Sequence, residues 1–230
     1  MKISIIIPTY NEAGIITKTL NNLQERQSKK SFIHEIIVVD GQSQDDTVLQ
    51  VSEFSLVNCV LSPKSRPKQM NVGAKKATGD ILYFLHADCI PPLDYDKHIV
   101  KVIQNGYKAG CFRMQFNNKH PWIKFISWLT KFKYRFCRGG DQSLFVCKAL
   151  FDEVGGFDER YLIFEDHDII SKLYKKTRFS VIQKQLISSA RRFEDKGILK
   201  LQLLFWAIYF KQWLGASPKD LFAFYKKHIE

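Results

Sequence analysis

The sequence lacks any apolar run long enough to cross a membrane. Its most apolar stretch, residues 201–210, holds ten residues without a formal charge and is bounded by Lys200 and Lys211, whereas a membrane-spanning helix needs about 20. Near the N-terminus only a short apolar run precedes Pro8, and it has no cleavage site of the secretory type. We therefore expect no transmembrane helix, no signal peptide and a cytoplasmic protein.

Cysteines, linkers and repeats are also scarce. The five cysteines are an odd number without a Cys-x-x-Cys pair, which argues against a disulfide framework or a zinc ribbon and fits a reducing compartment. No Ser/Gly linker, Pro-rich spacer or internal repeat marks a domain boundary. Because 230 residues suffice for one large domain but are short for two, we expect a single domain over residues 1–230.

Acidic residues are few in the second part of the chain. The chain has 35 Lys and Arg against 23 Asp and Glu, and residues 1–100 hold 11 of each sign, so residues 101–230 hold 24 basic and 12 acidic side chains. The net charge of +12 therefore lies in the second part. This asymmetry indicates an anionic partner, such as a membrane surface, a phosphorylated substrate or nucleic acid.

Short runs rich in Ile, Val and Leu, without polar alternation, predict strands buried on both faces of a parallel sheet. These runs cover residues 3–8, 35–40 and 80–86, with a weaker strand at 57–61. Helices are expected between them at residues 12–27 with Asn11 as N-cap, at 45–54, and at 67–78 with Gly79 closing the last one. The series predicts an α/β fold with an open, mostly parallel sheet flanked by helices.

Beyond residue 115 the sequence predicts helices that are added to this sheet. Aromatic and basic residues mix in two helical segments, 121–138 and 198–214. A last short helix over residues 219–228 is expected to pack Leu221, Phe222 and Tyr225 onto the body.

A carboxylate lies at or just after the end of each of three predicted strands. Glu12 follows the first strand, Asp40 ends the second, and Asp88 follows the third. Ligands of open parallel sheets bind outside the C-terminal strand ends, and a buried charge without a partner is costly. A base with amide donors, and a divalent cation neutralised by phosphates, would supply partners for these carboxylates.

These segments resemble the family 2 glycosyltransferases over nearly the whole chain. The matching motifs are Ile-Ile-Ile-Pro-Thr-Tyr-Asn-Glu at 5–12, Val-Val-Asp-Gly-Gln-Ser at 38–43, Gly-Asp-Ile-Leu-Tyr-Phe-Leu-His-Ala-Asp at 79–88, Gly-Gly-Asp-Gln at 139–142 and Phe-Glu-Asp at 164–166. Each motif is weak alone, but five in this order are specific. The Phe-Leu-His-Ala-Asp segment and the Ser-Ala-Arg-Arg segment at 189–192 resemble a short, soluble bacterial subgroup. The resemblance implies a GT-A-like fold, with a nucleotide-sugar-binding part at 1–115 and an acceptor-binding part with C-terminal helices at 116–230.

The resemblance implies a nucleotide site formed by the first three strand ends. Pro8, Tyr10 and Glu12 match positions that hold the uracil and ribose of a nucleotide sugar, most simply a UDP-sugar. Asp40 matches the carboxylate that accepts a base N–H, and Ala87 lies in the same nucleotide-binding set. The next turn leaves two interpretations open, because Ser43 fits a phosphate contact and a helix N-cap equally well.

The diphosphate and a metal ion are expected beside this nucleotide site. Asp88 matches the last carboxylate of the Asp-x-Asp motif, whose oxygens suit Mn²⁺ or Mg²⁺. His86 replaces the first Asp and is not assigned to the metal. Arg66 lies in a segment that resembles the Arg-x-x-Gln-x-Asn-x-Gly helix start of the family, where a cation suits a pyrophosphate.

Asp166 matches the catalytic base of the family, at the start of a predicted helix. Inverting transfer requires one carboxylate that takes the proton of the acceptor hydroxyl. Acidic residues also favour the first turn of any helix, and this reading stays open for Asp168. The candidates for binding the acceptor or the donor sugar are Asp141, Gln142 and Glu165.

The aromatic and basic segment 121–138 allows two interpretations. It could lie on an anionic lipid surface with its aromatic side chains inserted, or it could be an amphipathic helix that covers the sheet near the acceptor site, which we slightly favour. Nucleic acid is not expected as a partner, because no binding module accompanies the charge. The acceptor and the oligomeric state are not determined by the sequence.

Two other functions compete with sugar transfer. A nucleotidyltransferase would carry a Gly-rich, Arg-Lys loop after the first strand, and residues 8–12 contain none. A nucleotide-sugar-binding or membrane-associated scaffold without catalysis would not need both Asp88 and Asp166. The Gln-x-x-Arg-Trp motif of processive polymer synthases is absent from the sequence, so we expect transfer of one sugar.

Overall fold

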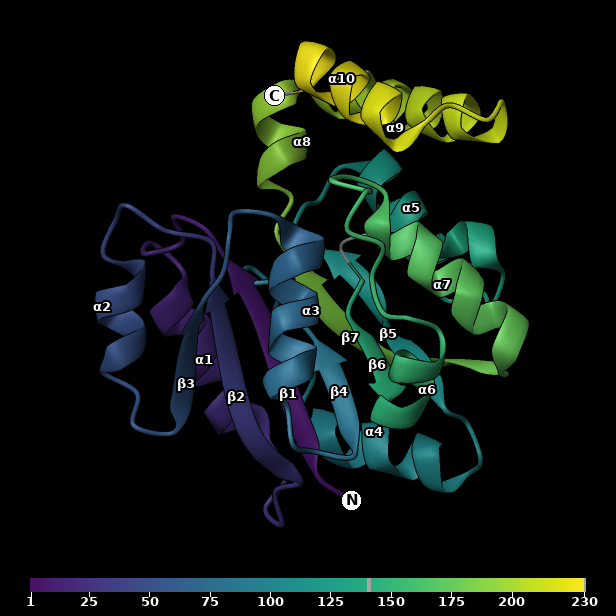
Figure 1. Ribbon diagram of the computed structural model, residues 1–230. Helices are drawn as coiled ribbons and strands as arrows, with labels where there is room; N and C mark the ends of the chain where they lie inside the picture. Colours follow the sequence, from purple (N-terminus) through teal and green to yellow (C-terminus); the bar gives the residue numbers. More distant parts are fainter. Residues whose placement is uncertain (140–141, 230) are drawn as a thin grey trace.

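The computed structural model describes residues 1–139 and 142–229, and in these residues seven strands form one sheet with helices on both faces (Figure 1). The strand order is β3-β2-β1-β4-β6-β5-β7. The strands are β1 (Ile3–Thr9), β2 (Ile33–Asp40), β3 (Val57–Leu61), β4 (Ile81–Phe84), β5 (Ala109–Phe116), β6 (Leu144–Cys147) and β7 (Phe179–Ser188). Within the described residues β6 is antiparallel to both its neighbours, and the other pairings are parallel. The predicted α/β fold with an open, mostly parallel sheet is confirmed.

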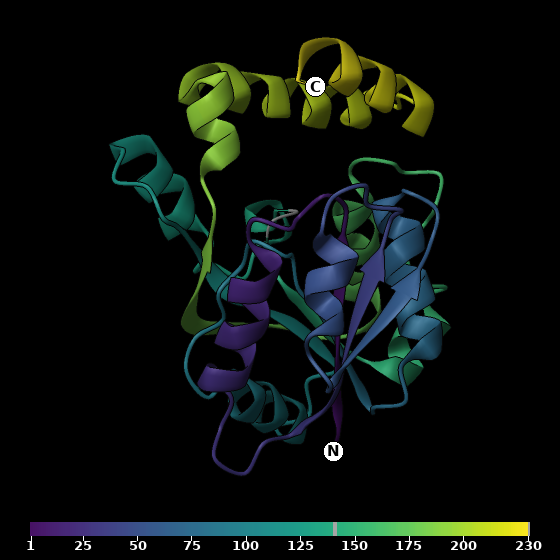
Figure 2. The same cartoon turned by 90° about the vertical axis from the view of Figure 1, so that its left-hand side faces the viewer.

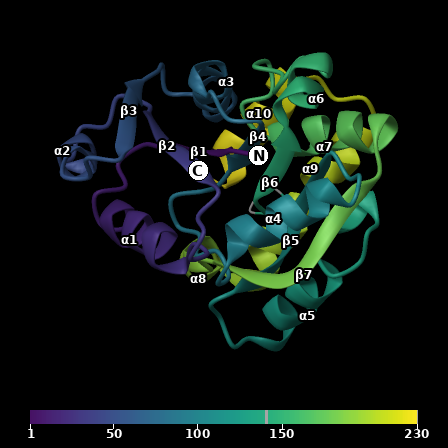
Figure 3. The ribbon, with the colours of Figure 1, turned by 90° about the horizontal axis from the view of Figure 1, so that it is seen from below.

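Helices cover both faces of the sheet, as the unbroken apolar strands predict. One face packs against α1 (Ile16–Arg26), α2 (Thr47–Ser52) and α4 (Tyr95–Gln104), and the other against α3 (Arg66–Lys76), α6 (Lys148–Glu153) and α7 (Glu165–Lys176) (Figure 3). A hydrophobic core lies on each face of the sheet, and alternate residues of β1 point into them. Ile5 and Ile7 belong to the first core and Ile6 to the second. From β1 the chain adds β2 and β3 on one side and then returns to place β4 on the other side of β1. Ligands of open α/β sheets bind at such a reversal of strand order, so the C-terminal ends of β1 and β4 are the expected ligand position.

A third core lies beyond the C-terminal ends of β1 and β4. It is built from α5 (Pro121–Leu129), α8 (Arg191–Lys196), α9 (Ile198–Trp213) and α10 (Pro218–His228), together with the end of β5. The last three helices lie across this end of the sheet (Figure 1, Figure 2). The expected last helix is present, and it buries Leu221 fully. In the described part of the chain, no helix combines the length and the apolar character that crossing a membrane requires.

The first helix begins four residues later than the sequence predicts, and Asn11 is not its N-cap. Asn11 has a positive φ of 54°. Its backbone N–H donates to the Ser43 hydroxyl (2.8 Å), and the next N–H, of Glu12, donates to Thr47 Oγ1 (2.8 Å). These bonds tie residues 11 and 12 to the loop after β2 and to the first residue of α2, and the helical pattern starts only at Ile16.

Ser43 and Gly79 also differ from their expected roles at helix ends. The second helix is shorter than residues 45–54, its N-cap position is Asp46, and the Ser43 hydroxyl instead donates to Asp40. The third helix ends at Lys76 with Ala77 in the C-cap position. Gly79 allows a close backbone approach, because a Cβ there would lie 2.9 Å from the carbonyl oxygen of Lys2.

The second part of the chain is more than helices added to a sheet. Strands β5, β6 and β7 complete the sheet from residue 109 onward, and the sequence analysis missed them because it read this region for helical periodicity. The expected helix over 121–138 is also too long. It ends at Leu129 and is followed by a turn and a short 3₁₀ helix, η1 (Arg135–Cys137).

Candidate functional site

A cavity of about 610 Å³ lies at the C-terminal ends of β1 and β4, and we call it the strand-end cavity. It is lined by the segments that follow both strands, by the start of α3, and by residues of α8 and α10. Among its lining residues are six of the predicted nucleotide and metal residues: Pro8, Tyr10, Glu12, Arg66, Ala87 and Asp88. The structure therefore brings together side chains that are up to 80 positions apart in the sequence.

Asp40 is the predicted nucleotide residue that does not line this cavity. Its side chain is fully buried at the end of β2. It accepts hydrogen bonds from the backbone N–H of Ser43 (2.8 Å) and from the Thr9 hydroxyl (3.4 Å). Thr9 lines the cavity, so the Thr9 side chain lies between Asp40 and the cavity. Its predicted contact with a base remains a prediction.

The strand-end cavity is rich in cations. Besides Arg66 it is lined by Lys64, Arg191, Arg192 and Lys226. The Lys64 ammonium lies 3.6 Å from the centre of the Tyr10 ring, a cation–π contact. This composition suits a ligand that combines a flat ring with negative charge.

Glu12 and Asp88 both line the cavity and interact electrostatically. Burial raises the pKa of Glu12, and the negative charge of Asp88 raises it further, while Arg191 and Arg192 lower it. Two carboxylates beside several cations are the arrangement expected where a diphosphate and a divalent cation would share the charge.

Asp88 meets the requirement for a metal ligand in this cavity. In the described residues no group of three or more His, Cys, Asp or Glu side chains is arranged to hold a metal ion. A Mn²⁺ or Mg²⁺ ion would therefore need oxygens from elsewhere, and Mg²⁺ is commonly held by one or two carboxylates, substrate phosphates and water. Asp88 would fit that pattern if a diphosphate bound in the same cavity.

Arg66 connects the strand-end cavity to the predicted catalytic base. Its Nε lies 3.4 Å from Glu165 Oε1 and its Nη2 lies 3.7 Å from Asp166 Oδ2. The same Nη2 lies 2.7 Å from Nε2 of His86. The guanidinium thus joins the start of α3, the end of β4 and the start of α7.

The start of α7 is held in an unusual backbone conformation. Phe164 has a φ of 72°, which is uncommon for a bulky residue and points to a functional constraint. Glu165 and Asp166, which follow it, are both buried. The predicted base therefore lies just inside the surface, beside Arg66, on a well-defined helix terminus.

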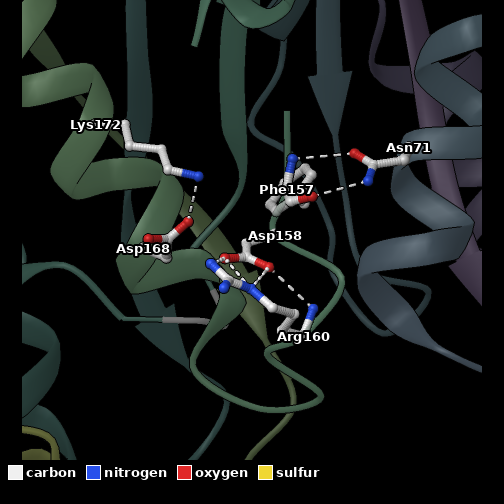
Figure 4. A network of polar contacts seen from close by, with 6 residues as sticks. All are labelled: Asn71, Phe157, Asp158, Arg160, Asp168 and Lys172. Atoms are coloured by element: carbon white, nitrogen blue, oxygen red, sulfur yellow. Dashed lines mark hydrogen bonds and ion pairs between the residues drawn. The ribbon is translucent and has the colours of Figure 1, made fainter. Parts of the chain in front are cut away.

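Asp168, the alternative base, is already paired. Its Oδ2 lies 2.7 Å from the Lys172 ammonium one turn along α7. Figure 4 shows this pair beside the loop before α7, where Asn71 of α3 contacts the backbone of Phe157 through both its amide atoms. In the same loop, Asp158 pairs with Arg160. The Asn71 contacts therefore fix the loop before α7 to α3.

The predicted sugar-binding residues are not gathered in the strand-end cavity. Gln142 is buried; its backbone N–H donates to Gly139 O (3.2 Å), and its side-chain Oε1 lies 3.9 Å from the Cys111 thiol. Asp141 lies outside the described residues. Glu165 faces Arg66 from beneath the cavity wall. Sugar contacts by these three residues remain predictions.

A second cavity, of about 700 Å³, lies on the other side of α7, and we call it the aromatic cavity. It is enclosed by α5, η1, α7 and α9. Its aromatic lining residues are Phe136, Tyr161, Phe164, Trp206, Tyr209 and Trp213. Two arginines, Arg135 and Arg138, also line it. His167 and Asp168, the two residues after Asp166, face this cavity, so the predicted base lies between the two cavities.

The sequence analysis missed part of the strand-end cavity. Arg191 and Arg192 were noted only as a subgroup segment, and Lys64 was not assigned, although it lies two residues from Arg66. Phe205 and Lys226 come from helices whose local sequence gives no sign of a ligand site. Only the folding of α8–α10 across the strand ends brings them there.

Comparison with known proteins identifies the family. Residues 4–151 match the family model described as Glycosyl transferase family 2. The chain belongs to this family. The subgroup suggested by the sequence is a finer statement that this match does not address.

Curated relatives match the family 2 chain over part of their length. A probable glycosyltransferase, YdaM, of Bacillus subtilis is 26% identical over 197 residues, which are 75% of this chain and 46% of the relative. The dolichol-phosphate mannosyltransferase of Pyrococcus furiosus is 31% identical over 111 residues, 46% of this chain and 31% of the relative. The chain thus spans less than half the length of these relatives.

A solved structure agrees with the fold. Staphylococcus aureus TarS, residues 1–349 in complex with UDP-GlcNAc, aligns with a TM-score of 0.69 and 24% identity, covering 83% of this chain and 59% of that one. The expected GT-A-like fold of the family 2 chain is confirmed.

Proposed function

We propose that the protein is an inverting glycosyltransferase that moves one sugar from a UDP-sugar to an acceptor hydroxyl, with a divalent cation and with Asp166 as general base. The observation that carries this proposal is the convergence of six predicted donor and metal residues on the strand-end cavity. Membership of family 2 and the UDP-GlcNAc bound to the TarS structure support it. We also propose that the chain belongs to the short bacterial subgroup that its His86-Ala87-Asp88 segment resembles.

The proposed donor site follows from the chemistry of the cavity. The base and ribose would lie by Pro8, Tyr10 and Glu12, and the diphosphate would lie by Asp88 and Arg66. A Mn²⁺ or Mg²⁺ ion held by Asp88 and phosphate oxygens would neutralise charge on the leaving diphosphate. Arg66 lines the same cavity, and its guanidinium would stabilise that charge as well.

The proposed transfer is a single displacement at C1 of the sugar. The acceptor oxygen forms a bond to C1, and the bond between C1 and the diphosphate oxygen breaks, with the electron pair leaving on UDP. The acceptor proton passes to a carboxylate oxygen of Asp166. Attack from the face opposite the diphosphate inverts C1. The position of Asp166 beside Arg66 and between the two cavities supports this role.

We propose a cytoplasmic location with peripheral contact to an anionic membrane through residues 121–138. This segment supports both sequence interpretations: Ile123 of α5 is fully buried, whereas Phe125 and Trp128 are exposed. Lys131 lies 4.1 Å from the centre of the Trp128 ring. The helix therefore covers the body with one face and presents aromatic and basic side chains on the other.

The proposed activity is tested by screening the purified protein with Mn²⁺ against nucleotide sugars, with release of the nucleoside diphosphate as readout. We expect release from a UDP-sugar. Release of pyrophosphate would indicate a nucleotidyltransferase, and binding without any release in the presence of acceptor extracts would indicate a scaffold.

The metal assignment is tested by calorimetry of UDP binding with Mn²⁺ and with EDTA. Asp88→Ala should abolish the enhancement of binding by Mn²⁺, whereas Asp40→Ala should weaken binding even in EDTA because its carboxylate is assigned to the base. Unchanged enhancement in Asp88→Ala would refute the metal site.

A further inference from the structure

The aromatic cavity opens on a surface that is unusually apolar for a protein in water. Helix α9 is apolar on both sides. Leu201 and Ile208 on its inner side are buried in the third core. Its outer side carries a stripe at helical spacing that is exposed throughout, formed by Leu199, Leu203, Trp206, Phe210 and Trp213. We call this stripe the outer face of α9.

The outer face of α9 is continuous with the aromatic side chains of α5 and η1. The ring centres of Trp206 and Trp122 lie 5.9 Å apart and join the two helices. From Trp122 a chain of ring contacts continues through Phe125, Trp128, Phe132, Tyr134 and Phe136. Large contiguous apolar surfaces of this kind mark sites of interaction with a protein or a membrane.

The two segments that carry this surface are basic. Residues 117–139 and 196–219, which contain α5, η1 and α9, include ten Lys and Arg but no Asp or Glu. Lys131 lies over both Trp128 and Phe132, at 4.1 and 4.9 Å from their ring centres. Exposed aromatic rings flanked by cations suit the interface of an anionic bilayer, where apolar groups enter the acyl boundary and cations meet the headgroups.

The aromatic cavity belongs to the same surface. Phe136 and Trp213 line the cavity and are also 79% and 77% exposed, so its rim is part of the apolar surface. At its inner end the cavity reaches His167 and Asp168, next to the proposed base. A molecule held in a bilayer on this surface could place its head in the cavity without leaving the lipid.

We propose that the outer face of α9, with the aromatic side chains of α5 and η1, rests on an anionic lipid bilayer, and that the acceptor is an amphiphile of that bilayer. The hydroxyl-bearing head of the acceptor enters the aromatic cavity between Arg135 and α9, while its apolar part stays along the rim. The acceptor assignment rests on the proposed glycosyl transfer, but the bilayer contact does not.

Bilayer contact is tested by co-sedimentation with vesicles of phosphatidylcholine alone or mixed with phosphatidylglycerol. The full chain should bind the anionic vesicles, and binding should fall with salt because exposed charges are screened within about 10 Å at 0.1 M. The triple variant Leu199→Ser, Leu203→Ser, Phe210→Ser should lose binding by about tenfold or more, since it removes three large apolar side chains from the interface. None of these three residues lines the strand-end cavity.

A matched control removes exposed leucines elsewhere. Leu49, Leu56 and Leu61 are equally exposed but lie on α2 and β3 or between them, so their triple Ser variant should bind vesicles normally. Calorimetry should give the same UDP affinity for both triple variants. This measurement checks, independently of vesicle binding, that each variant is folded and keeps its donor site. Absence of vesicle binding by the full chain, equal loss in both variants, or a dimer that the α9 variant dissolves would overturn the bilayer proposal.

The acceptor class is tested by binding, independently of turnover. Tryptophan fluorescence should change on addition of octyl glucoside below its micelle concentration and not with methyl glucoside. Trp213→Ala in the cavity should weaken the response, whereas the α9 triple variant should retain it. No response, or a response that does not depend on the alkyl chain, would overturn the proposal that the acceptor is an amphiphile. The proposed sugar transfer is tested separately, by turnover of UDP-sugars.

Discussion

Asp166 is the residue on which the proposed chemistry depends. Asp166→Asn should retain UDP affinity and lose transfer by roughly 10²–10⁴-fold, the usual contribution of a positioned proton acceptor. The amide preserves the shape of the side chain but cannot accept the proton. The measurement is turnover against UDP affinity once an acceptor is available.

Its neighbours on α7 provide matched controls. Asp168→Asn breaks the ion pair in which the Lys172 ammonium lies 2.7 Å from Asp168 Oδ2. It should cost far less transfer, because that carboxylate is already paired. Glu165→Gln should also cost less than the Asp166 variant, since Glu165 is buried against Arg66. Near-normal transfer by Asp166→Asn would refute its role as base and move the search to Asp168 or Asp141.

At the scale of elements, the contact between α7 and α9 should depend on pH through His167. This ring stacks on Phe164 with ring centres 4.5 Å apart and shares a hydrogen bond with the Tyr209 hydroxyl of α9. Burial, and then the charge of Arg135, lower the pKa of His167 from 6.5 to about 4. The folded state therefore favours the neutral ring, whereas the unfolded chain binds a proton below pH 6.5.

Stability should consequently fall as the pH drops from about 6.5 to about 4 and then level off with respect to this group. The expected loss is on the order of 2–3 kcal/mol, since one pKa unit corresponds to about 1.4 kcal/mol. Urea unfolding of His167→Gln across this pH range should show a smaller decline than the parent. His34→Gln, on the exposed end of β2, should leave the decline unchanged.

The packing of α3 on the sheet depends on Gly73. A Cβ at this position would lie 2.4 Å from Cγ2 of Ile6 and 3.0 Å from Cγ2 of Val39, both in the core. Gly73→Ala should therefore destabilise the protein by about 1–3 kcal/mol, although alanine favours a helix over glycine by about 1 kcal/mol. Gly14→Ala is the control, because a Cβ there meets nothing within 4 Å. Equal unfolding midpoints for the two variants would contradict this packing.

At the scale of the whole molecule, the last helix contributes to the donor site. Lys226 of α10 lines the strand-end cavity together with residues of β1 and of the segment after β4, which lie about 140 or more positions earlier. Lys226→Ala should weaken UDP binding by roughly 2- to 5-fold at low salt, the range expected for an exposed charge, and the difference should shrink at high salt. The neighbouring variant Lys227→Ala provides the control, because Lys227 is exposed and does not line the cavity. Equal UDP affinities of the two variants at low salt would contradict a contribution of α10 to the donor site.

The sequence by itself determined the half of the sheet formed by β3, β2, β1 and β4, and most of the donor site. The apolar runs at β1, β2 and β4 specify strands that must be covered on both faces, and polar residues that follow parallel strands must meet at one edge. For this reason Pro8, Glu12 and Asp88 could be assigned to one site from their positions along the chain. The start of α7 at Glu165 was also expected from its acidic first turn and from the family resemblance.

Only the tertiary structure decided the rest, because it depends on contacts between segments far apart in the sequence. The late start of α1 results from hydrogen bonds that Asn11 makes to the loop after β2 and Glu12 makes to the start of α2. The antiparallel strand β6 is four residues long and has no periodicity that a local reading can use. The contact of Arg66 with Asp166 spans 100 positions, and only the packing of the whole chain leaves one side of α9 exposed. Local sequence sets which faces are apolar, whereas the packing of the whole chain sets which of them are covered.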